Sequence, residues 1–433
     1  MPVDWLFLMY LDGDNNLQAS IRQDLNEMEA GIYQLPNEVA VSVVVLWDGA
    51  GAGDSQLYEL GPDTNPGKLG VYTVDVTGSA EWIQNNEVDM SDGKTLTDFL
   101  VWAKKRYPAK NVVLQFGDHG AGPRTAAVNR AMMVDDTTGT NSLMYSKEVS
   151  QAFYGAFVEN PHDCYWNHLG LVLFDICLGA SLEDAYEIYP FAKYAVASPG
   201  AISGKGMNYT TLIGGLTPEM DITALGKRLV SDYKKEYAAV KSRGLTCIDL
   251  AQVQNVRAKL DILAALLLKQ GDLHKFGQVF ISSSGTPLSL TYLDASALLL
   301  RSTQAGYSGT FTWLYDLGIF AEQMALSAAP QVGGGANPGR WDEMEKAAKD
   351  LTAALRGAIV CSWNSGGIGE AGRLNIPYDG ARIPYGITIC GAPSTSTGGA
   401  GYPGWYRTDL TFGATSKWYD LLAIWYARHV WDR

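Results

Sequence analysis

The stretch LVLFDICLGAS, residues 171–181, decides the fold. Its apolar run ends in an acid, a cysteine and a glycine, which is typical of a buried strand in a parallel sheet. Open parallel sheets bind their ligands beyond the carboxyl ends of the strands. We therefore expect Cys177 at the functional edge of a sheet, with Asp175 on the same side because strand side chains alternate. Taken alone, the stretch favours a merely structural cysteine, since free Cys often packs as a small hydrophobe.

A second stretch, NVVLQFGDHGAG at residues 111–122, is built in the same way. Its apolar run leads to His119, and a glycine-rich turn follows. The interval between His119 and Cys177 is long enough for one crossover helix, which parallel strands need. A histidine and a cysteine at one edge of one sheet form a base and a nucleophile within reach of each other. The pair therefore favours catalysis over the structural interpretation of either residue.

With these motifs the chain resembles the clostripain family of cysteine peptidases, which share the caspase-like fold. The resemblance rests first on FGDHGAG at residues 116–122 and LFDICL at residues 173–178. Further pieces follow the family's pattern in order along the chain: YLDGDNNL at 10–17, DDTTG at 135–139, ASPG at 197–200, GMNY at 206–209, LTCIDL at 245–250 and GITI at 386–389.

The resemblance implies an α/β fold, with a caspase-like, mainly parallel central sheet flanked by helices and a mostly helical C-terminal extension. A chain of 433 residues is large for a single hydrophobic core. Strand–helix alternation gives way to helical periodicity near residue 220. We therefore place a peptidase core at residues 1–220, and at residues 221–433 a helical region with late strands packed on the core.

Composition limits the partners and the compartment. The net charge of −13 argues against nucleic acid or an anionic membrane as the main partner, and no stretch is apolar for long enough to span a bilayer. We expect a protein or peptide substrate, while the oligomeric state is not predicted. No leader is visible, and the five cysteines are odd in number and widely spaced. Both features favour a cytoplasmic location with free thiols.

The expected chemistry is cleavage of a peptide bond by a thiolate. A neighbouring imidazolium lowers the pKa of a cysteine from about 8.5, so we expect Cys177 to be the nucleophile and His119 its base. By resemblance to the family, the backbone N–H groups of Gly120 and Cys177 form the oxyanion hole. No third triad member is legible. Asp118 is adjacent to His119, but neighbouring side chains at a strand end point apart, so a role in the turn is expected.

Asp175 carries the expectation about specificity. An acid at the end of an apolar strand is unfavourable unless it is paired, so a structural salt bridge or a cap is one alternative. In the family, the acid two residues before the cysteine lies in the pocket for the residue before the scissile bond. A carboxylate there selects Arg, then Lys, because a guanidinium binds it through two parallel hydrogen bonds.

Self-cleavage is expected between Arg130 and Ala131. The turn-rich segment 123–142 joins the histidine and cysteine strands, and exposed turn-rich segments are the usual sites of nicking. The resemblance agrees, because processing to two chains in the family falls in this region. The alternative is that Arg130 is a solvated loop charge and that the chain stays intact.

No cofactor and no metal site are expected from the sequence, although the family resemblance leaves calcium open. The Asp12–Asn16 run has acids in the manner of a calcium loop, but its glycine is misplaced and the closing Glu is absent. Two other functions stay open. One is an intracellular signalling protease of the same fold, acting on one dedicated protein partner. The other is a non-peptidase α/β ligand-binding protein, which would lack the usual glycine-rich phosphate loop after its first strand.

Overall fold

The computed structural model describes residues 1–65, 68–120, 132–135, 142–240, 243–270, 314–328, 338–365, 385–390 and 405–431. The chain forms two compact units. Unit 1 consists of Met1–Gly179, Glu187–Ser198 and Ile202–Glu236, and unit 2 of Ala180–Tyr186, Pro199–Ala201 and Tyr237–Arg433. The chain passes between the units around α4 (Leu182–Ile188). The domain boundary near residue 220 stays a prediction.

A mainly parallel sheet is the centre of unit 1. Five adjacent strands run parallel, in the order β9 (Ala192–Ala197), β8 (Leu169–Asp175), β5 (Ala109–Gly117), β1 (Val3–Asp12) and β2 (Val41–Asp48). Two antiparallel strands continue the sheet beyond β2, namely β3 (Gln56–Glu59) and β4 (Val74–Asp75). The central strands are apolar runs buried on both faces, as parallel strands covered by helices require.

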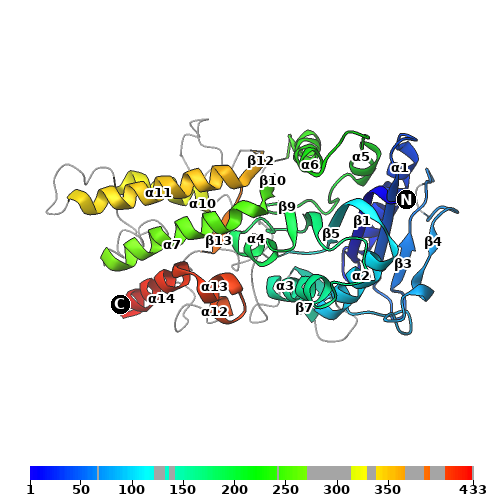
Figure 1. Cartoon of the computed structure of the whole chain (residues 1–433), viewed down its shortest axis with the longest axis horizontal. Helices are drawn as coiled ribbons and strands as arrows, with labels where there is room; N and C mark the ends of the chain where they lie inside the picture. Colours follow the sequence, from blue (N-terminus) through cyan, green and yellow to red (C-terminus); the bar gives the residue numbers. More distant parts are fainter. Residues whose placement is uncertain are drawn as a thin grey trace. The chain divides into compact units, whose positions relative to one another are not determined.

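Helices cover both faces of this sheet (Figure 1). On one face lie α1 (Gln18–Gln34), α5 (Tyr209–Gly214) and α6 (Ile222–Tyr237), and on the other α2 (Gly93–Arg106) and α3 (Ser146–Tyr154). The start of α2 follows from Asp92, whose side chain accepts a hydrogen bond from the backbone N–H of Lys94. The described part of the unit also has short elements: the 3₁₀ helix η1 (Thr77–Ser79), the π-helix η3 (Gly155–Glu159), and a hairpin of β6 (Met133–Asp135) and β7 (Ser142–Met144).

The register of β1, β5 and β8 brings three loops to one edge. Leu11 lies opposite Gly117, and Gly117 lies opposite Asp175. On the face of the sheet that α2 covers, Phe116 stacks on Phe174 with ring centroids 5.5 Å apart. This contact helps to hold β5 and β8 in register. The segments that follow β1, β5 and β8 therefore begin at the same edge of the sheet.

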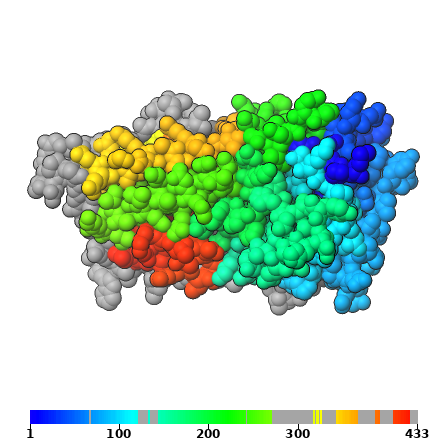
Figure 2. Space-filling view, viewed as in Figure 1, coloured from blue at the N-terminus to red at the C-terminus, as the bar shows by residue number. Residues whose placement is uncertain are grey.

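Unit 2 is mostly helical. Four helices pack against one another in the order α10 (Leu317–Ala328), α11 (Pro338–Ala358), α7 (Val253–Gln270) and α14 (Lys417–Trp431). Of these, α11, α7 and α14 are visible as adjacent bands in Figures 1 and 2. Two antiparallel strand pairs accompany them, β10 (Gly244–Asp249) with β12 (Ile359–Asn364) and β11 (Leu314–Asp316) with β13 (Thr388–Cys390). The short helices are η4 (Leu250–Gln252), α12 (Trp405–Thr408) and α13 (Thr411–Thr415).

The predicted fold class is confirmed. The sheet is mainly parallel and flanked by helices, and the C-terminal part is mostly helical with late strands. Among the described residues, no helix has both the length and the apolar character needed to cross a membrane.

Candidate active site

The structure brings His119, Gly120 and Cys177 together. His119 and Cys177 follow the neighbouring parallel strands β5 and β8 at the same edge of the sheet. A Cβ added to Gly120 would collide with the carbonyl oxygen of Cys177 and lie 2.8 Å from its backbone nitrogen. The backbone after the histidine therefore lies directly against the backbone of the cysteine, and only glycine allows this approach.

Cys177 lies on a sharp turn rather than in the strand itself. Its side chain is half-buried, and the backbone N–H of Ile202 points at its Sγ at 3.4 Å. The next residue, Leu178, has a left-handed backbone with φ of 64° and is 1% exposed. A left-handed leucine is unfavourable by about 1–2 kcal/mol, so burial of its side chain must hold it there. A donor at sulfur favours the thiolate over the thiol.

His119 has a polar partner that the sequence did not reveal. Its Nε2 lies 2.7 Å from Oδ1 of Asn16, in the turn that follows β1. Asp118 faces elsewhere, since its Oδ1 accepts a hydrogen bond from Nδ2 of Asn15 at 2.8 Å. The expectation that Asp118 is a residue of the turn agrees with this bond. The motif YLDGDNNL contained Asn16, but nothing in it indicated which histidine it would meet.

Asp175 is a buried carboxylate with one oxygen satisfied. It is 7% exposed, and its Oδ2 accepts hydrogen bonds from the Met207 N–H at 2.9 Å and the Tyr209 hydroxyl at 2.6 Å. Its Oδ1 is buried and has no hydrogen-bond partner. Burial raises the pKa of Asp175 to about 6, although the bonds from Tyr209 and Met207 lower it. Among the described residues no cation pairs with Asp175, so the structural salt bridge is not formed.

The surroundings of Asp175 are acidic and closely fitted. Burial raises the pKa of Asp24, on α1, well above its usual range, and the charges of Asp175 and Glu27 raise it further. Gly206 has a φ of 61°, and a Cβ there would collide with the Asp175 carboxylate. The loop before α5 therefore needs glycine both for its conformation and for its approach to the acid.

A second group of acids lies at the ends of β1 and β2. Carboxylate oxygens of Asp14, Asp48 and Asp135 lie within 4.8 Å of one another, and all three residues are buried. Burial raises the pKa of Asp48 to about 8, even though Ser55 donates a hydrogen bond to its Oδ1 at 2.6 Å. The Oδ2 atoms of Asp12 and Asp48 are buried without hydrogen-bond partners. Oxygen ligands of this kind fit a hard cation such as calcium. The sequence-based expectation of no metal is untested.

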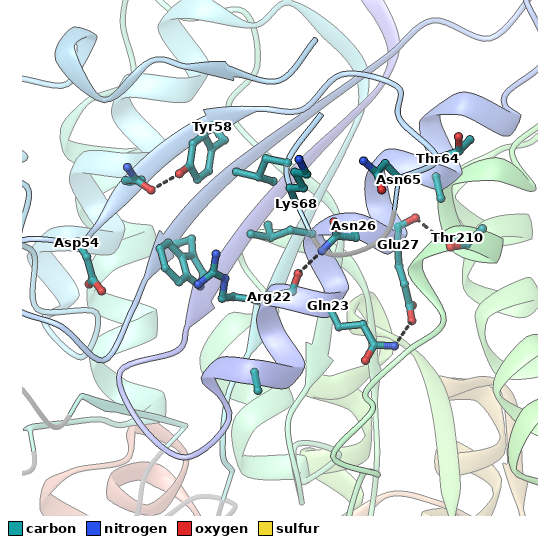
Figure 3. A pocket seen from close by; sticks show the side chains of 16 residues that line it. Arg22, Gln23, Asn26, Glu27, Asp54, Tyr58, Thr64, Asn65, Lys68 and Thr210 are labelled. Carbon is teal, nitrogen blue, oxygen red and sulfur yellow. Dashed lines mark hydrogen bonds between the residues drawn. The ribbon is translucent and has the colours of Figure 1, made fainter. Parts of the chain in front are cut away.

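A separate pocket of about 820 Å³ lies on unit 1 (Figure 3). Its lining comes from α1, β2, β3, the following loop and Thr210, and it includes both cations, such as Arg22 and Lys68, and acids, such as Asp54 and Glu27. None of the predicted site residues lines it. Arg22 lies over the ring of Trp47, 5.9 Å from its centroid, which leaves that cation already engaged.

The predicted cleavage site lies outside the described residues. The structure describes the chain up to Gly120 and again from Met132, and Arg130 and Ala131 belong to the stretch between them. On the downstream side, the chain is anchored by Asp135, whose Oδ2 accepts a hydrogen bond from the Met90 N–H at 2.9 Å.

Comparison with known proteins supports the assignment that the motifs suggested. A family model described as the clostripain family matches residues 9–332. A protein named clostripain, from Hathewaya histolytica, is 28% identical over 249 residues. That match covers 51% of this chain and 44% of the relative, so the chain spans less than half the length of that curated relative.

Solved structures agree on the fold. A secreted cysteine protease from Bacteroides thetaiotaomicron, in complex with an irreversible peptide inhibitor, is 16% identical with a TM-score of 0.60, covering 96% of this chain and 99% of that one. An inactive zymogen protease from Parabacteroides distasonis is 16% identical with a TM-score of 0.59, covering 96% and 98%. At this identity the likeness supports the fold alone.

The cytoplasmic location predicted from the sequence is wrong, because solved relatives of the same fold are described as secreted. The alternative of an intracellular signalling protease loses its support with it. One basis of the prediction was the wide spacing of the cysteines, and spacing along the chain does not measure distance in the fold. Cys247 on β10 lies directly opposite Cys361 on β12, although 114 residues separate them along the chain.

Proposed function

Because the chain belongs to the clostripain family of cysteine peptidases, as its motifs predicted, we propose that it cleaves peptide bonds after arginine and, less readily, after lysine. One observation carries this specificity. Asp175, two residues before Cys177, is a buried carboxylate whose Oδ1 has no hydrogen-bond partner. A buried, unsatisfied anion is costly, and a cationic side chain of the substrate would satisfy it.

The proposed reaction begins with proton transfer from the Cys177 thiol to His119. The thiolate Sγ attacks the carbonyl carbon of the scissile bond, and the carbonyl electron pair moves onto oxygen. The backbone N–H groups of Gly120 and Cys177 donate hydrogen bonds to this oxyanion. The close approach of the two backbones at Gly120 supports this pair of donors.

The second half of the reaction returns the proton and frees the enzyme. The oxyanion collapses, the carbon–nitrogen bond breaks, and the imidazolium of His119 protonates the leaving amine. A thioester on Cys177 remains. Water attacks the thioester with His119 as base, the carbon–sulfur bond breaks, and the sulfur regains its proton as the carboxylic product leaves.

Asp175 would bind the arginine of the substrate in a fixed orientation. Its Oδ2 is held by the Met207 N–H and the Tyr209 hydroxyl, so the carboxylate cannot rotate without losing both bonds. The Oδ1 without a hydrogen-bond partner would receive the guanidinium, while Glu27 adds negative charge nearby. Lysine offers a single ammonium without the planar fork, which explains a weaker preference.

The same preference supports self-cleavage between Arg130 and Ala131. The segment that contains Arg130 would act as an internal substrate and present this arginine to Asp175. Cleavage would leave Arg130 as a new C-terminus and Ala131 as a new N-terminus. A solved relative is described as an inactive zymogen, which makes activation by processing a reasonable expectation for this family. Asp135, which follows the proposed cut, has a firm anchor at Met90, so the new N-terminal segment would stay attached.

Calcium, which the family resemblance leaves open, would fit the oxygens of Asp14, Asp48 and Asp135. The buried Oδ2 atoms of Asp12 and Asp48, which lack hydrogen-bond partners, support this choice. A bound divalent cation would neutralise charge there and brace the ends of β1 and β2.

Cleavage of matched reporter peptides tests the proposal. The peptides carry Arg, Lys or Ala before the reporter group and are otherwise identical. Wild-type protein should prefer Arg over Lys and leave Ala almost uncut, and Cys177→Ala should cut none of them. Equal cleavage of the Arg and Ala peptides by wild-type protein would contradict the specificity, and full activity of Cys177→Ala would contradict the nucleophile.

A further inference from the structure

The turn after β1 meets the turn after β5 because these strands are parallel neighbours. Leu11 lies opposite Gly117, so Asn16 and His119 leave the same edge of the sheet. The turn after β1 is tightly fixed. Its Asp14 N–H donates to Asp12 Oδ1 at 3.0 Å, and the Leu17 N–H donates to Asn15 Oδ1 at 2.8 Å. On either side of Asn16, a backbone N–H group therefore donates to a side chain of the turn and holds its shape.

The side chain of Asn16 has one partner, and it is the proposed base. Asn16 is exposed, and within the described part of the chain its only side-chain hydrogen bond runs to His119 Nε2, at 2.7 Å. An exposed asparagine contributes little to the core, so this bond does not follow from packing. The neighbouring acid, Asp118, has its own partner in Asn15. The place that an acid would take in a triad is thus occupied by an amide.

We propose that Asn16 is a positioning residue for His119, an inference that rests on the proposed function. The amide oxygen accepts a hydrogen bond, so the hydrogen of the neutral ring lies on Nε2. The other nitrogen, Nδ1, then has the lone pair that takes the proton of the Cys177 thiol. Asn16 fixes both the tautomer and the plane of the ring. Because an amide is neutral, Asn16 does so without adding a negative charge near the thiolate.

Two substitutions separate the role of the hydrogen bond from that of the side chain. Asn16→Ala removes the acceptor, and Asn16→Asp restores it with a charge. We expect Asn16→Ala to lower kcat on the order of 100-fold with little change in KM, because a loosened base is misplaced in the transition state. Asn16→Asp should recover most of kcat, and its carboxylate should move the imidazolium limb of the pH–rate profile to higher pH.

A second measurement avoids any assumption about the substrate. Alkylation of Cys177 by iodoacetamide, resolved from the other four cysteines by peptide mass spectrometry, reports the thiolate directly. Asn16→Ala should slow alkylation below pH 7, where the thiolate depends on the imidazolium. The matched control is Asn37→Ala, another exposed asparagine, four residues before β2 begins at the opposite edge of the sheet. It should match wild type in both assays.

The outcomes distinguish this inference from the proposed function. If Asn16→Ala keeps wild-type kcat and alkylation while His119→Ala loses both, Asn16 has no positioning role and the proposed function stands. If His119→Ala itself leaves both unchanged, the proposed function fails. If both Asn16 variants melt at a lower temperature than wild type, and Asn16→Asp recovers neither kcat nor the alkylation rate, the role of Asn16 is structural and the inference is overturned.

Discussion

Replacing Asp175 with asparagine should make the protein more stable and less selective at the same time. The substitution keeps the shape of the side chain and removes its charge. In the wild-type chain this carboxylate is 7% exposed, and burial raises its pKa from 3.8 to about 6. A carboxyl whose pKa is higher in the folded than in the unfolded chain opposes folding when it is ionised.

The magnitude follows from the two pKa values. At about 1.4 kcal/mol per pH unit between them, the ionised group destabilises the folded chain by about 3 kcal/mol above pH 6. Protonation removes this cost progressively as the pH falls from 6 to below 4. Asp175→Asn should therefore raise the free energy of unfolding at pH 7.5 by up to about 3 kcal/mol, less whatever the amide loses in the bonds from Met207 and Tyr209. The gain over wild type should vanish near pH 4.

Urea denaturation followed by tryptophan fluorescence measures this difference, with Cys177→Ala in both proteins to prevent proteolysis. Asp4→Asn is the matched control, because Lys110 and the Ala40 N–H hold the pKa of Asp4 below its usual value. Asp4→Asn should lower the free energy of unfolding at pH values above the pKa of Asp4, which is the opposite of the change expected for Asp175→Asn. If Asp175→Asn lowers the free energy of unfolding equally at pH 7.5 and pH 4, the reasoning is refuted, because the carboxylate would then act as a structural hydrogen-bond acceptor.

The same substitution in the active protein should cost about 2–5 kcal/mol of selection for Arg over Ala reporters, the range for a buried charge pair. Wild-type selection should also weaken below pH 6, as the free carboxyl protonates. Loss of all activity toward every reporter would instead indicate damage to the turn of Cys177.

The remaining predictions concern the nucleophile, the cut and the cation. Cys177→Ala or His119→Ala should each lower turnover by several orders of magnitude on an Arg reporter, and wild-type rates in either would exclude that residue. On a denaturing gel, wild type should give a fragment that begins at Ala131, while Cys177→Ala and Arg130→Ala stay intact; a single uncut chain in active wild type would exclude processing as the trigger. Calcium should raise the melting temperature of wild type more than of Asp48→Asn, and equal shifts would place any bound ion elsewhere.

The sequence could predict that His119 and Cys177 follow neighbouring strands at one edge of the sheet, because the signal for each strand is local. An apolar run that ends in Cys177 and another that leads to His119 identify two strand ends, and parallel strands bring such ends to one edge. Asp175 follows from the same run. These features need only the pattern along each strand and the rule that ligands bind at the carboxyl edge.

Asn16 and the acid group could not be predicted because they depend on strand order. Asn16 meets His119 only because β1 is the neighbour of β5, which no local pattern states. The spacing of acids in the Asp12–Asn16 run did not match a calcium loop, and in the fold Asp14 is grouped with Asp48 and Asp135 from other elements. A site assembled across strands has no spacing rule in the sequence.

Burial of acidic side chains is common to both groups of acids at this edge. Burial raises the pKa of Asp12, Asp24, Asp48 and Asp175 above the usual range, so ionisation of each of these acids is less favourable in the folded chain than in the unfolded chain. Groups that destabilise a fold and gather at one place are typical of sites that act on a ligand. The proposed preference for a basic substrate and the proposed calcium site would therefore share one physical basis, the burial of these acids.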